Sequence, residues 1–202
     1  MSRVTDVAGG AIPLLIEPQF LTPRDCDRIR RAMDRGDDDP AEIVGDTIVT
    51  REAIRRTTSI EIDPDVREWF ERRLDGCRPA IAHALGRPLG QREGAGFLRY
   101  PPEGFYLPHR DRGEVAGWPA AARRAASVVV FLNGSITSRP PRRQTGEFEG
   151  GLLCLHPDST GTPVHITPEA GLLVAFPAEV LHEVLPVRSG TRDAAVDWFY
   201  DG

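Results

Sequence analysis

The stretch from residue 100 to 111, which reads Y-P-P-E-G-F-Y-L-P-H-R-D, constrains this chain more than any other. In an extended strand successive side chains point to opposite faces, so His109 and Asp111 project from the same face and Arg110 is turned away. An imidazole and a carboxylate that converge in this way supply two of the three ligands of a first-row metal site, and a second histidine must then come from elsewhere. The alternative is a surface histidine beside an aspartate, because H-x-D arises often by chance.

The residues around this pair favour the metal. Their order resembles the Y-x-x-G-x-x-Y-x-x-H-x-D segment of prolyl 4-hydroxylase-like, 2-oxoglutarate-dependent Fe(II) oxygenases. Tyr100, Tyr106, His109 and Asp111 stand at the spacing of that family, whereas the glycine is displaced by one position, to Gly104. We therefore expect the turn before the metal pair to differ from that of the family.

Three later stretches extend the resemblance over residues 95–200. Residues 128–133 (V-V-V-F-L-N) resemble the buried strand that follows the metal pair in the family, and residues 148–155 (F-E-G-G-L-L-C-L) resemble its G-G strand. Residues 166–198 follow its closing pattern, in which an apolar strand and F-P precede a distal histidine, and G-x-R precedes a final tryptophan. Several motifs in the right order are far more specific than H-x-D alone.

The resemblance implies roles for particular residues. His182 stands where the family has its distal histidine, and Arg192 stands where it has the residue that binds the far carboxylate of 2-oxoglutarate. A guanidinium suits that role because it stays protonated and binds a carboxylate through two parallel hydrogen bonds. Tyr100 is expected to help through its hydroxyl or else to pack in the barrel wall, and Tyr106 either lines the substrate cavity or packs in the turn. The implied cofactors are Fe(II), 2-oxoglutarate and dioxygen, with ascorbate as a candidate reductant.

The other histidines have less to support them as ligands. His156 and His165 bracket a polar loop, H-P-D-S-T-G-T-P-V-H, and are expected to be exposed. His83 belongs to a helical segment and is expected to be structural.

The first 94 residues predict a short strand at 12–16 and two helices. Thr22 and Pro23 are typical of an N-cap and a first helical position, for a helix that runs to residue 34. Asp63 and Pro64 repeat this pattern, and the second helix is expected to end at a glycine, residue 86. Its apolar residues recur at steps of three and four, which predicts that one face packs against a sheet. The aspartate-rich stretch 36–40 is expected to be a loop, and T-T-S-I-E-I, within 55–63, has the composition of a strand.

The rest of the chain is rich in short strands separated by Gly, Pro and polar turns. The candidates are residues 97–100, 128–132, 152–155, 172–175, 183–187 and 194–199. Periodicity alone allows a sandwich or a barrel, and the resemblance implies a double-stranded β-helix, a jelly-roll or cupin-like core with the metal at one open end. We expect a mainly β protein with flanking α-helices that forms a single domain over residues 1–202, in which 1–94 support a core at 95–202.

Composition excludes several classes of protein. The net charge of -5 argues against a nucleic-acid partner, and all 25 basic residues are arginine, so Schiff-base chemistry on a lysine is impossible. No apolar run approaches the length of a membrane span and the N-terminus does not resemble a signal peptide, so a cytoplasmic protein without membrane contact is expected, as a monomer or homodimer. Cys26, Cys77 and Cys154 form neither a disulfide framework nor a C-x-x-C zinc site and are expected to be core thiols.

Two long segments, 113–126 and 134–147, are expected at the mouth of the barrel. The second segment contains three arginines, whose charge would suit an anionic substrate or an acidic partner, and a solvated loop is the alternative. These arginines are Arg139, Arg142 and Arg143. Arg55 and Arg56, near a strand edge, are weaker candidates.

The sequence thus favours an enzyme that hydroxylates an unactivated C-H bond of a small molecule, such as an amino acid or a natural-product intermediate, and releases succinate and CO2. Asp111 favours hydroxylation because related halogenases have a small residue in its place. A prolyl or other residue of a protein or peptide is the alternative substrate. A non-catalytic jelly-roll binding module is the alternative of another class, and a zinc hydrolase would leave Arg192 unexplained.

Overall fold

The computed structural model describes residues 12–40, 53–114, 118–136, 146–157 and 161–202. The larger sheet contains β1 (Leu15–Glu17), β2 (Asp37–Pro40), β3 (Thr58–Glu61), β4 (Leu89–Arg92), β5 (Gly96–Tyr100), β7 (Arg124–Phe131), β11 (Leu173–Pro177) and β14 (Arg192–Asp201). The smaller sheet contains β6 (Tyr106–His109), β9 (Leu153–His156), β10 (Val164–Ile166) and β12 (Leu181–Val184), and β8 (Glu149–Gly150) pairs with β13 (Val187–Ser189).

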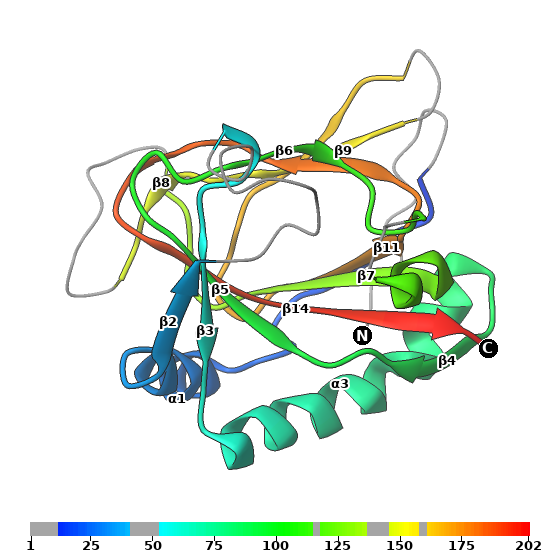
Figure 1. Cartoon of the computed structure of the whole chain (residues 1–202), viewed down its shortest axis with the longest axis horizontal. Helices are drawn as coiled ribbons and strands as arrows, with labels where there is room; N and C mark the ends of the chain where they lie inside the picture. The colour runs from blue at the N-terminus through cyan, green and yellow to red at the C-terminus, as the bar shows by residue number, and fades with distance from the viewer. Residues whose placement is uncertain (1–11, 41–52, 115–117, 137–145, 158–160) are drawn as a thin grey trace.

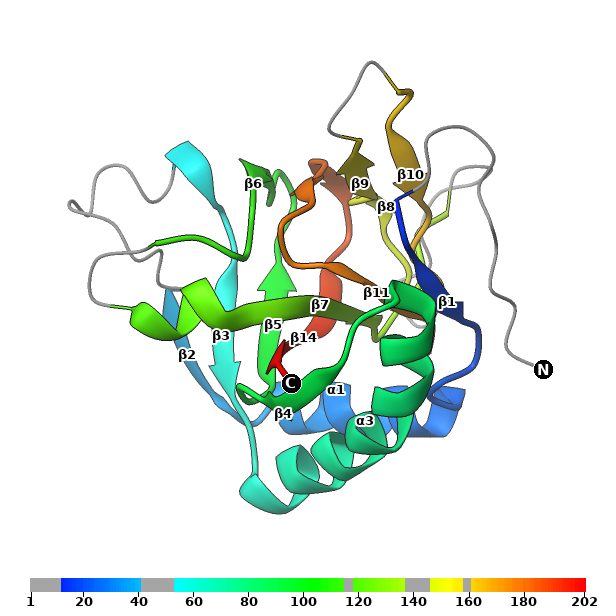
Figure 2. The ribbon, with the colours of Figure 1, turned by 90° about the vertical axis from the view of Figure 1, so that its right-hand side faces the viewer.

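The two sheets face each other across the interior of the molecule (Figures 1 and 2). The strand order is β1-β11-β7-β14-β5-β3-β2 in the larger sheet, with β4 also paired to β14, and β10-β9-β12-β6 in the smaller sheet. This arrangement confirms the predicted mainly β fold with a double-stranded β-helix core.

Two helices cover the outer face of the larger sheet, as Figure 2 shows. The helix α1 (Pro23–Met33) begins with a capping box, in which Thr22 and Asp25 satisfy each other's backbone N-H groups. The helix α3 (Pro64–Leu85) has Asp63 as its N-cap and ends at Gly86, whose φ of 63° is the left-handed conformation that favours glycine. Both predicted helices are confirmed to within one residue at each end.

The strand β7 is buried on both faces because it separates two apolar cores. Val128 belongs to the apolar cluster on the helix side of the sheet, together with Ile29 of α1 and Phe70 of α3. Its neighbour Val129 points the other way and packs with Leu155 of the smaller sheet. The helices therefore support, from behind, the wall that faces the barrel interior.

Two loop predictions were wrong. Residues 36–40 contain the strand β2, which pairs antiparallel with β3 in the register Asp38↔Ile60. Backbone hydrogen bonds hold the two strands together and do not require apolar side chains. The aspartate-rich composition therefore favoured a loop although the segment is a strand. Residues 113–126 contain a 3-10 helix, η1 (Pro119–Arg123), and the start of β7.

The prediction that His156 and His165 are exposed is confirmed for His165 and wrong for His156. His156 is the last residue of β9 and lies partly buried, and His165 is an exposed residue of β10. These strands pair with each other, with Cys154 opposite His165, so the polar segment connects a hairpin whose strands include both histidines.

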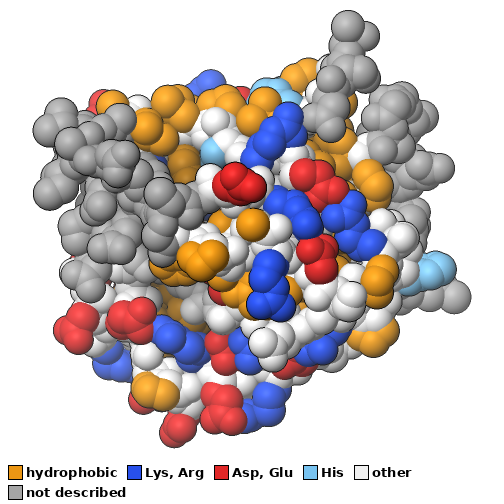
Figure 3. Space-filling model, turned by 45° about the vertical axis from the view of Figure 1, so that its right-hand side comes forward, with side chains coloured by type: hydrophobic (Ala, Val, Ile, Leu, Met, Phe, Trp, Pro, Cys, Tyr) orange, Lys and Arg blue, Asp and Glu red, His pale blue; other side chains and the backbone are white. Residues whose placement is uncertain are grey.

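Arginine and acidic side chains are interspersed on the face shown in Figure 3. Among the described residues several arginine and acidic side chains form ion pairs, such as Arg87 with Glu179 and Arg112 with Asp201. Neither helix in the described part of the chain has an apolar stretch that could cross a membrane.

Candidate active site

Two neighbouring strands of the smaller sheet bring His109 and His182 together. The strands β6 and β12 pair antiparallel with these residues as Cα partners, so the two imidazoles stand on the same face. Asp111 lies two residues beyond the end of β6, where its own N-H and that of Arg112 donate to the carbonyl of Ala178, at 3.0 and 2.9 Å. Asp111 is therefore held in place although it lies just outside the strand.

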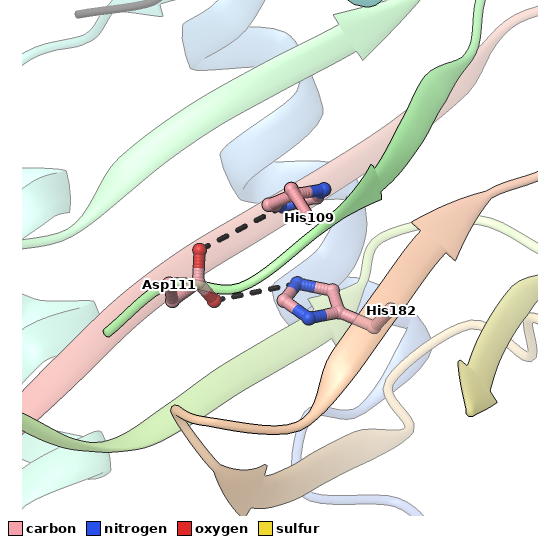
Figure 4. Close-up of side chains that lie close together, drawn as sticks. All are labelled: His109, Asp111 and His182. Carbon is pink, nitrogen blue, oxygen red and sulfur yellow. Dashed lines mark ion pairs between the residues drawn. The ribbon is translucent and has the colours of Figure 1, made fainter. Parts of the chain in front are cut away.

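The three side chains converge on one point, as Figure 4 shows. The Nε2 atom of His109 lies 3.7 Å from Oδ1 of Asp111, and Nε2 of His182 lies 3.4 Å from Oδ2. In both histidines Nδ1 is 2.9 Å from a backbone carbonyl, that of Leu107 or Val180, and a carbonyl can only accept a hydrogen bond. Each Nδ1 therefore carries the proton, which orients the ring and turns Nε2 toward the common point.

The electrostatics of this cluster favour a bound cation. Burial, together with the charge of His182, lowers the pKa of His109 to about 3, so this imidazole is neutral at pH 7. Burial alone would raise the pKa of Asp111, but His182, His109 and Ser127 outweigh it and hold that pKa well below its usual range. Burial lowers and the Asp111 carboxylate raises the pKa of His182, with a net rise. The carboxylate thus attracts positive charge, which a proton or a metal ion can supply.

Three neighbours fix the orientation of the cluster. The hydroxyl of Ser127, in β7, donates to Oδ2 of Asp111 at 2.6 Å and so links the two sheets. The ring of Tyr106 stacks on that of His109, with centroids 3.5 Å apart, and the ring of Phe176 meets His182 at 4.8 Å with an interplanar angle of 67°. Sequence reasoning missed Ser127, whose only signal is that it is the one hydroxyl in the apolar run A-A-S-V-V-V-F-L.

Arg192 is a buried cation with an unused donor. It begins β14 opposite Tyr100 of β5, is 1% exposed, and its guanidinium carbon lies 4.8 Å from the centroid of the Tyr100 ring. Burial lowers the pKa of Arg192, although Tyr100 and Asp193 act in the opposite direction. Among the described residues its Nε has no hydrogen-bond partner. A planar donor in this state fits a carboxylate that comes from outside the chain.

Gly151 has no side chain, and this leaves room for the side chain of Arg192. Its φ is 61°, and a Cβ atom there would lie 2.9 Å from Cδ of Arg192 and 2.9 Å from Cε2 of Phe148. A side chain at this position would therefore displace the guanidinium or the phenyl ring. This gives a physical reason for a glycine in the G-G strand.

Arg192 and the metal cluster border the same part of the interior. Tyr100, which contacts Arg192, belongs to an apolar cluster with Val184 of β12, and Tyr106 packs against that cluster. Val184 lies two residues after His182 on the same face of its strand. The two parts of the candidate site are thus connected through packed side chains.

Arg55 lies beside this site. It forms an isolated bridge with Tyr106, and its guanidinium carbon lies 4.7 Å from the centroid of the Tyr106 ring. Its buried Nε has no hydrogen-bond partner among the described residues. Arg56 differs, since its side chain is half exposed and is paired with Glu103.

The remaining candidates lie elsewhere. The loop arginines Arg139, Arg142 and Arg143 fall outside the described residues. His156 is 2.8 Å from Glu183, and both lie on the opposite face of the smaller sheet from His182.

The donor set fits Fe(II) and 2-oxoglutarate. Two imidazole nitrogens and one carboxylate form the set that non-haem Fe(II) oxygenases use, with positions left open for substrate. The unpartnered Nε of buried Arg192 provides a separate donor for the second carboxylate of a dicarboxylic acid.

Comparisons with known proteins agree with this arrangement. A PKHD-type hydroxylase of Nitrobacter winogradskyi is 26% identical over 183 residues, which are 88% of this chain and 74% of that protein. A PKHD-type hydroxylase of Parvibaculum lavamentivorans is 33% identical over 104 residues, which are 50% of this chain but only 41% of that protein. The crystal structure of a Pseudomonas putida prolyl-4-hydroxylase superposes with a TM-score of 0.70 at 27% identity, over 95% of this chain and 94% of that chain.

A family model matches the half of the chain that contains both parts of the candidate site, and this match shows the family. The model of the 2OG-Fe(II) oxygenase superfamily matches residues 95–200. The chain therefore belongs to the superfamily of oxygenases that use Fe(II), 2-oxoglutarate and dioxygen.

Proposed function

We propose that this protein hydroxylates an unactivated C-H bond of a small molecule that carries a carboxylate, such as an amino acid or a natural-product intermediate. In this proposal His109, Asp111 and His182 hold Fe(II), and Arg192 holds the far carboxylate of 2-oxoglutarate with help from Tyr100. When bound, Fe(II) and 2-oxoglutarate would supply the oxidising power together with dioxygen, and 2-oxoglutarate would be converted to succinate and CO2.

We also infer a single domain over residues 1–202, because β1 to β4 of the N-terminal part join the same sheet as β7 and β14.

The protein's own contribution is to bind and to orient. The Nδ1 hydrogen bonds of His109 and His182 aim both Nε2 lone pairs, and Ser127 fixes the rotation of the Asp111 carboxylate. Arg192 is fixed by its contacts with Tyr100 and Phe131, so a carboxylate bound there does not have to order the guanidinium.

The observation that carries the substrate class is the position of Arg55. Its buried Nε is unpartnered among the described residues, and its guanidinium lies over Tyr106, whose ring in turn stacks on His109. A carboxylate bound to Arg55 would place the rest of a small molecule next to the metal ligands. Tyr106 would then form one wall of the substrate site.

The test compares a panel of free amino acids with a peptide library. Each is supplied with Fe(II) and 2-oxoglutarate, and succinate is measured above the background formed without substrate. We expect turnover of at least one amino acid, and Arg55→Met should raise its KM about tenfold or more, since a hydrogen bond to a charged group is lost. Arg56→Met is the matched control and should leave KM unchanged, because Arg56 is turned away toward Glu103.

A prolyl residue in a peptide is the second candidate substrate. The similarity to the Pseudomonas putida prolyl-4-hydroxylase over nearly the full length of both chains favours it. Turnover of peptides alone would replace our substrate proposal with this one. If iron-loaded protein formed no succinate with or without any substrate, the non-catalytic binding module would be the better description.

A further inference from the structure

The smaller sheet carries a second cluster of metal-binding side chains on its outer face. Along β12, His182 points into the barrel and Glu183 points out. Glu183 is the Cα partner of Cys154 in β9, as His182 is of Leu155, so Glu183 and Cys154 share the outer face. Figure 2 shows β9 with its neighbour β10 at this side of the molecule.

Three different donor types meet on this face. The Sγ of Cys154, a ring nitrogen of His156 and a carboxylate oxygen of Glu183 all lie within 4.8 Å of one another. Nε2 of His156 and Oε1 of Glu183 are 2.8 Å apart. In a tetrahedral zinc site, with bonds of about 2.0 to 2.3 Å, ligand atoms lie about 3.3 to 3.8 Å apart, so small rotations of these side chains would suffice.

Burial and charge also suit a divalent cation. Cys154 is 2% exposed, whereas the side chains of His156 and Glu183 are 25% and 20% exposed, so the cluster is sheltered but reachable from solvent. One thiolate, one carboxylate and one neutral imidazole carry two negative charges, which a divalent ion cancels. Without such an ion, the contact between His156 and Glu183 is explained as a hydrogen bond, but the thiol beside that carboxylate is not explained.

The position of Cys154 differs from that of the other thiols. Cys26 lies within the apolar core between the helices and the larger sheet, and Cys77 packs against the same core. Cys154 belongs to none of the three apolar clusters formed by the described residues. The expectation that all three cysteines are simply core thiols therefore holds less well for Cys154.

We propose that Cys154, His156 and Glu183 form a second metal site, for Zn²⁺. The combination of thiolate and imidazole favours zinc over calcium or magnesium, which prefer oxygen ligands. The exposed His165, opposite Cys154 in β10, is the side chain from which a fourth ligand would come. A metal here joins β9 to β12 on the reverse side of the strand that carries His182, so it would stiffen the support of the candidate iron site without taking part in oxidation.

Cobalt(II) titration distinguishes the two sites, because a thiolate ligand gives an intense near-ultraviolet charge-transfer band that nitrogen and oxygen ligands do not give. We expect wild-type protein, titrated anaerobically, to bind a second equivalent of Co²⁺ with this band, and Zn²⁺ to bleach it because zinc binds such sites more tightly. Cys154→Ser should remove the band and leave the first equivalent bound. Cys77→Ser is the matched control and should keep the thiolate band and both equivalents of bound Co²⁺.

Two results would overturn the proposal: no thiolate band in wild-type protein, or a band that persists in Cys154→Ser. His156→Gln provides a second variant at a partly exposed position, in case the cysteine variant does not fold. It should weaken Co²⁺ binding at the thiolate site about tenfold or more, and an unchanged affinity would contradict the assignment of His156 as a ligand.

Discussion

Arg192 and Asp193 are neighbours in β14 and are both buried, yet Asp193 is paired with charges of the chain whereas Arg192 has a donor that is unpaired among the described residues. Asp193 points to the helix side, where its carboxylate accepts from Nε of Arg30 at 2.9 Å and from Nε of Arg99 at 2.7 Å. Burial alone would lower the pKa of Arg99, but Asp193 raises it above its usual value. Arg192 points into the barrel, where burial lowers its pKa and its Nε finds no partner among the described residues.

The contrast separates charges that hold the fold from charges kept for a ligand. A buried ion whose partners all lie within the chain is not stabilised further by a bound ligand, and removal of one partner leaves an uncompensated charge. A buried ion with an unused donor is unfavourable in the folded protein until a ligand pairs with it. Such groups mark functional sites, because stability is sacrificed there for binding.

The largest expected effect comes from removing the paired carboxylate. Asp193→Ala would leave Arg30 and Arg99 without their buried partner and should lower the free energy of unfolding by about 4 kcal/mol. Urea denaturation followed by tryptophan fluorescence measures this. Asp34→Ala is the matched control, since Asp34 also pairs with Arg99 but is 60% exposed, and it should cost less than about 1 kcal/mol. Equal losses in the two variants would contradict the distinction between buried and exposed pairs.

Asp197, on the same side of β14 as Asp193, is an incompletely paired carboxylate. Its Oδ1 accepts from the N-H of Gly94, but its Oδ2 has no hydrogen bond among the described residues, and Arg92 is 3.6 Å away. Burial raises its pKa from 3.8 to about 6, with a contribution from Glu71. The folded state therefore binds the proton more tightly than the unfolded state, so the stabilisation is complete below pH 3.8 and is lost as the pH rises through about 6.

This predicts a pH-dependent difference between wild-type protein and Asp197→Asn. The free energy of unfolding of the wild type, minus that of the variant, should fall by roughly 2.5 kcal/mol between about pH 4 and pH 7. Carboxyl groups whose pKa is lowered, such as those of Asp75 and Glu179, act in the opposite sense, and the subtraction removes them. A difference that stays flat over this range would show that Asp197 is ionised in the folded protein throughout.

For the unpaired cation the expected effect is on binding. Arg192→Met keeps the length of the side chain but removes the charge, so 2-oxoglutarate should bind about 100-fold more weakly while the free energy of unfolding stays equal or rises. Anaerobic titration of the Fe(II)-loaded protein with 2-oxoglutarate, followed by the visible charge-transfer band of the chelate, measures the first quantity. Arg192→Lys retains the charge but lacks the planar guanidinium, so its affinity for 2-oxoglutarate should lie between those of the wild type and Arg192→Met. A large loss of stability with unchanged binding would make Arg192 a structural residue like Arg99.

The sequence predicted the parts of the molecule that depend on local rules. Both helices carry their capping signals within a few residues. The H-x-D spacing predicted that His109 and Asp111 converge, and they do, although Asp111 lies in a bend after β6 and not in the strand that the prediction assumed. The β2 strand was not predictable, because D-D-D-P has none of the alternation of apolar and polar residues by which a strand is recognised, and backbone hydrogen bonds pair it with β3. The Asp193 pairs join residues 163 and 94 positions apart, and no local pattern connects residues at such separations.

Ser127 was missed for the same reason, and it provides the smallest effect that the comparison predicts. Its hydroxyl, in the larger sheet, donates to Asp111, which follows a strand of the smaller sheet, so the contact exists only once the barrel is closed. Ser127→Ala should leave the fold intact and weaken Fe(II) binding about tenfold, because the carboxylate is then free to rotate. Ser135→Ala removes a comparable hydrogen bond, to the carbonyl of Gly150, and should leave the Fe(II) affinity unchanged. If both variants bind Fe(II) like the wild type, then the two histidines and the backbone hydrogen bonds to the carbonyl of Ala178 are sufficient to position Asp111, and the Ser127 hydroxyl is not needed to organise the metal cluster.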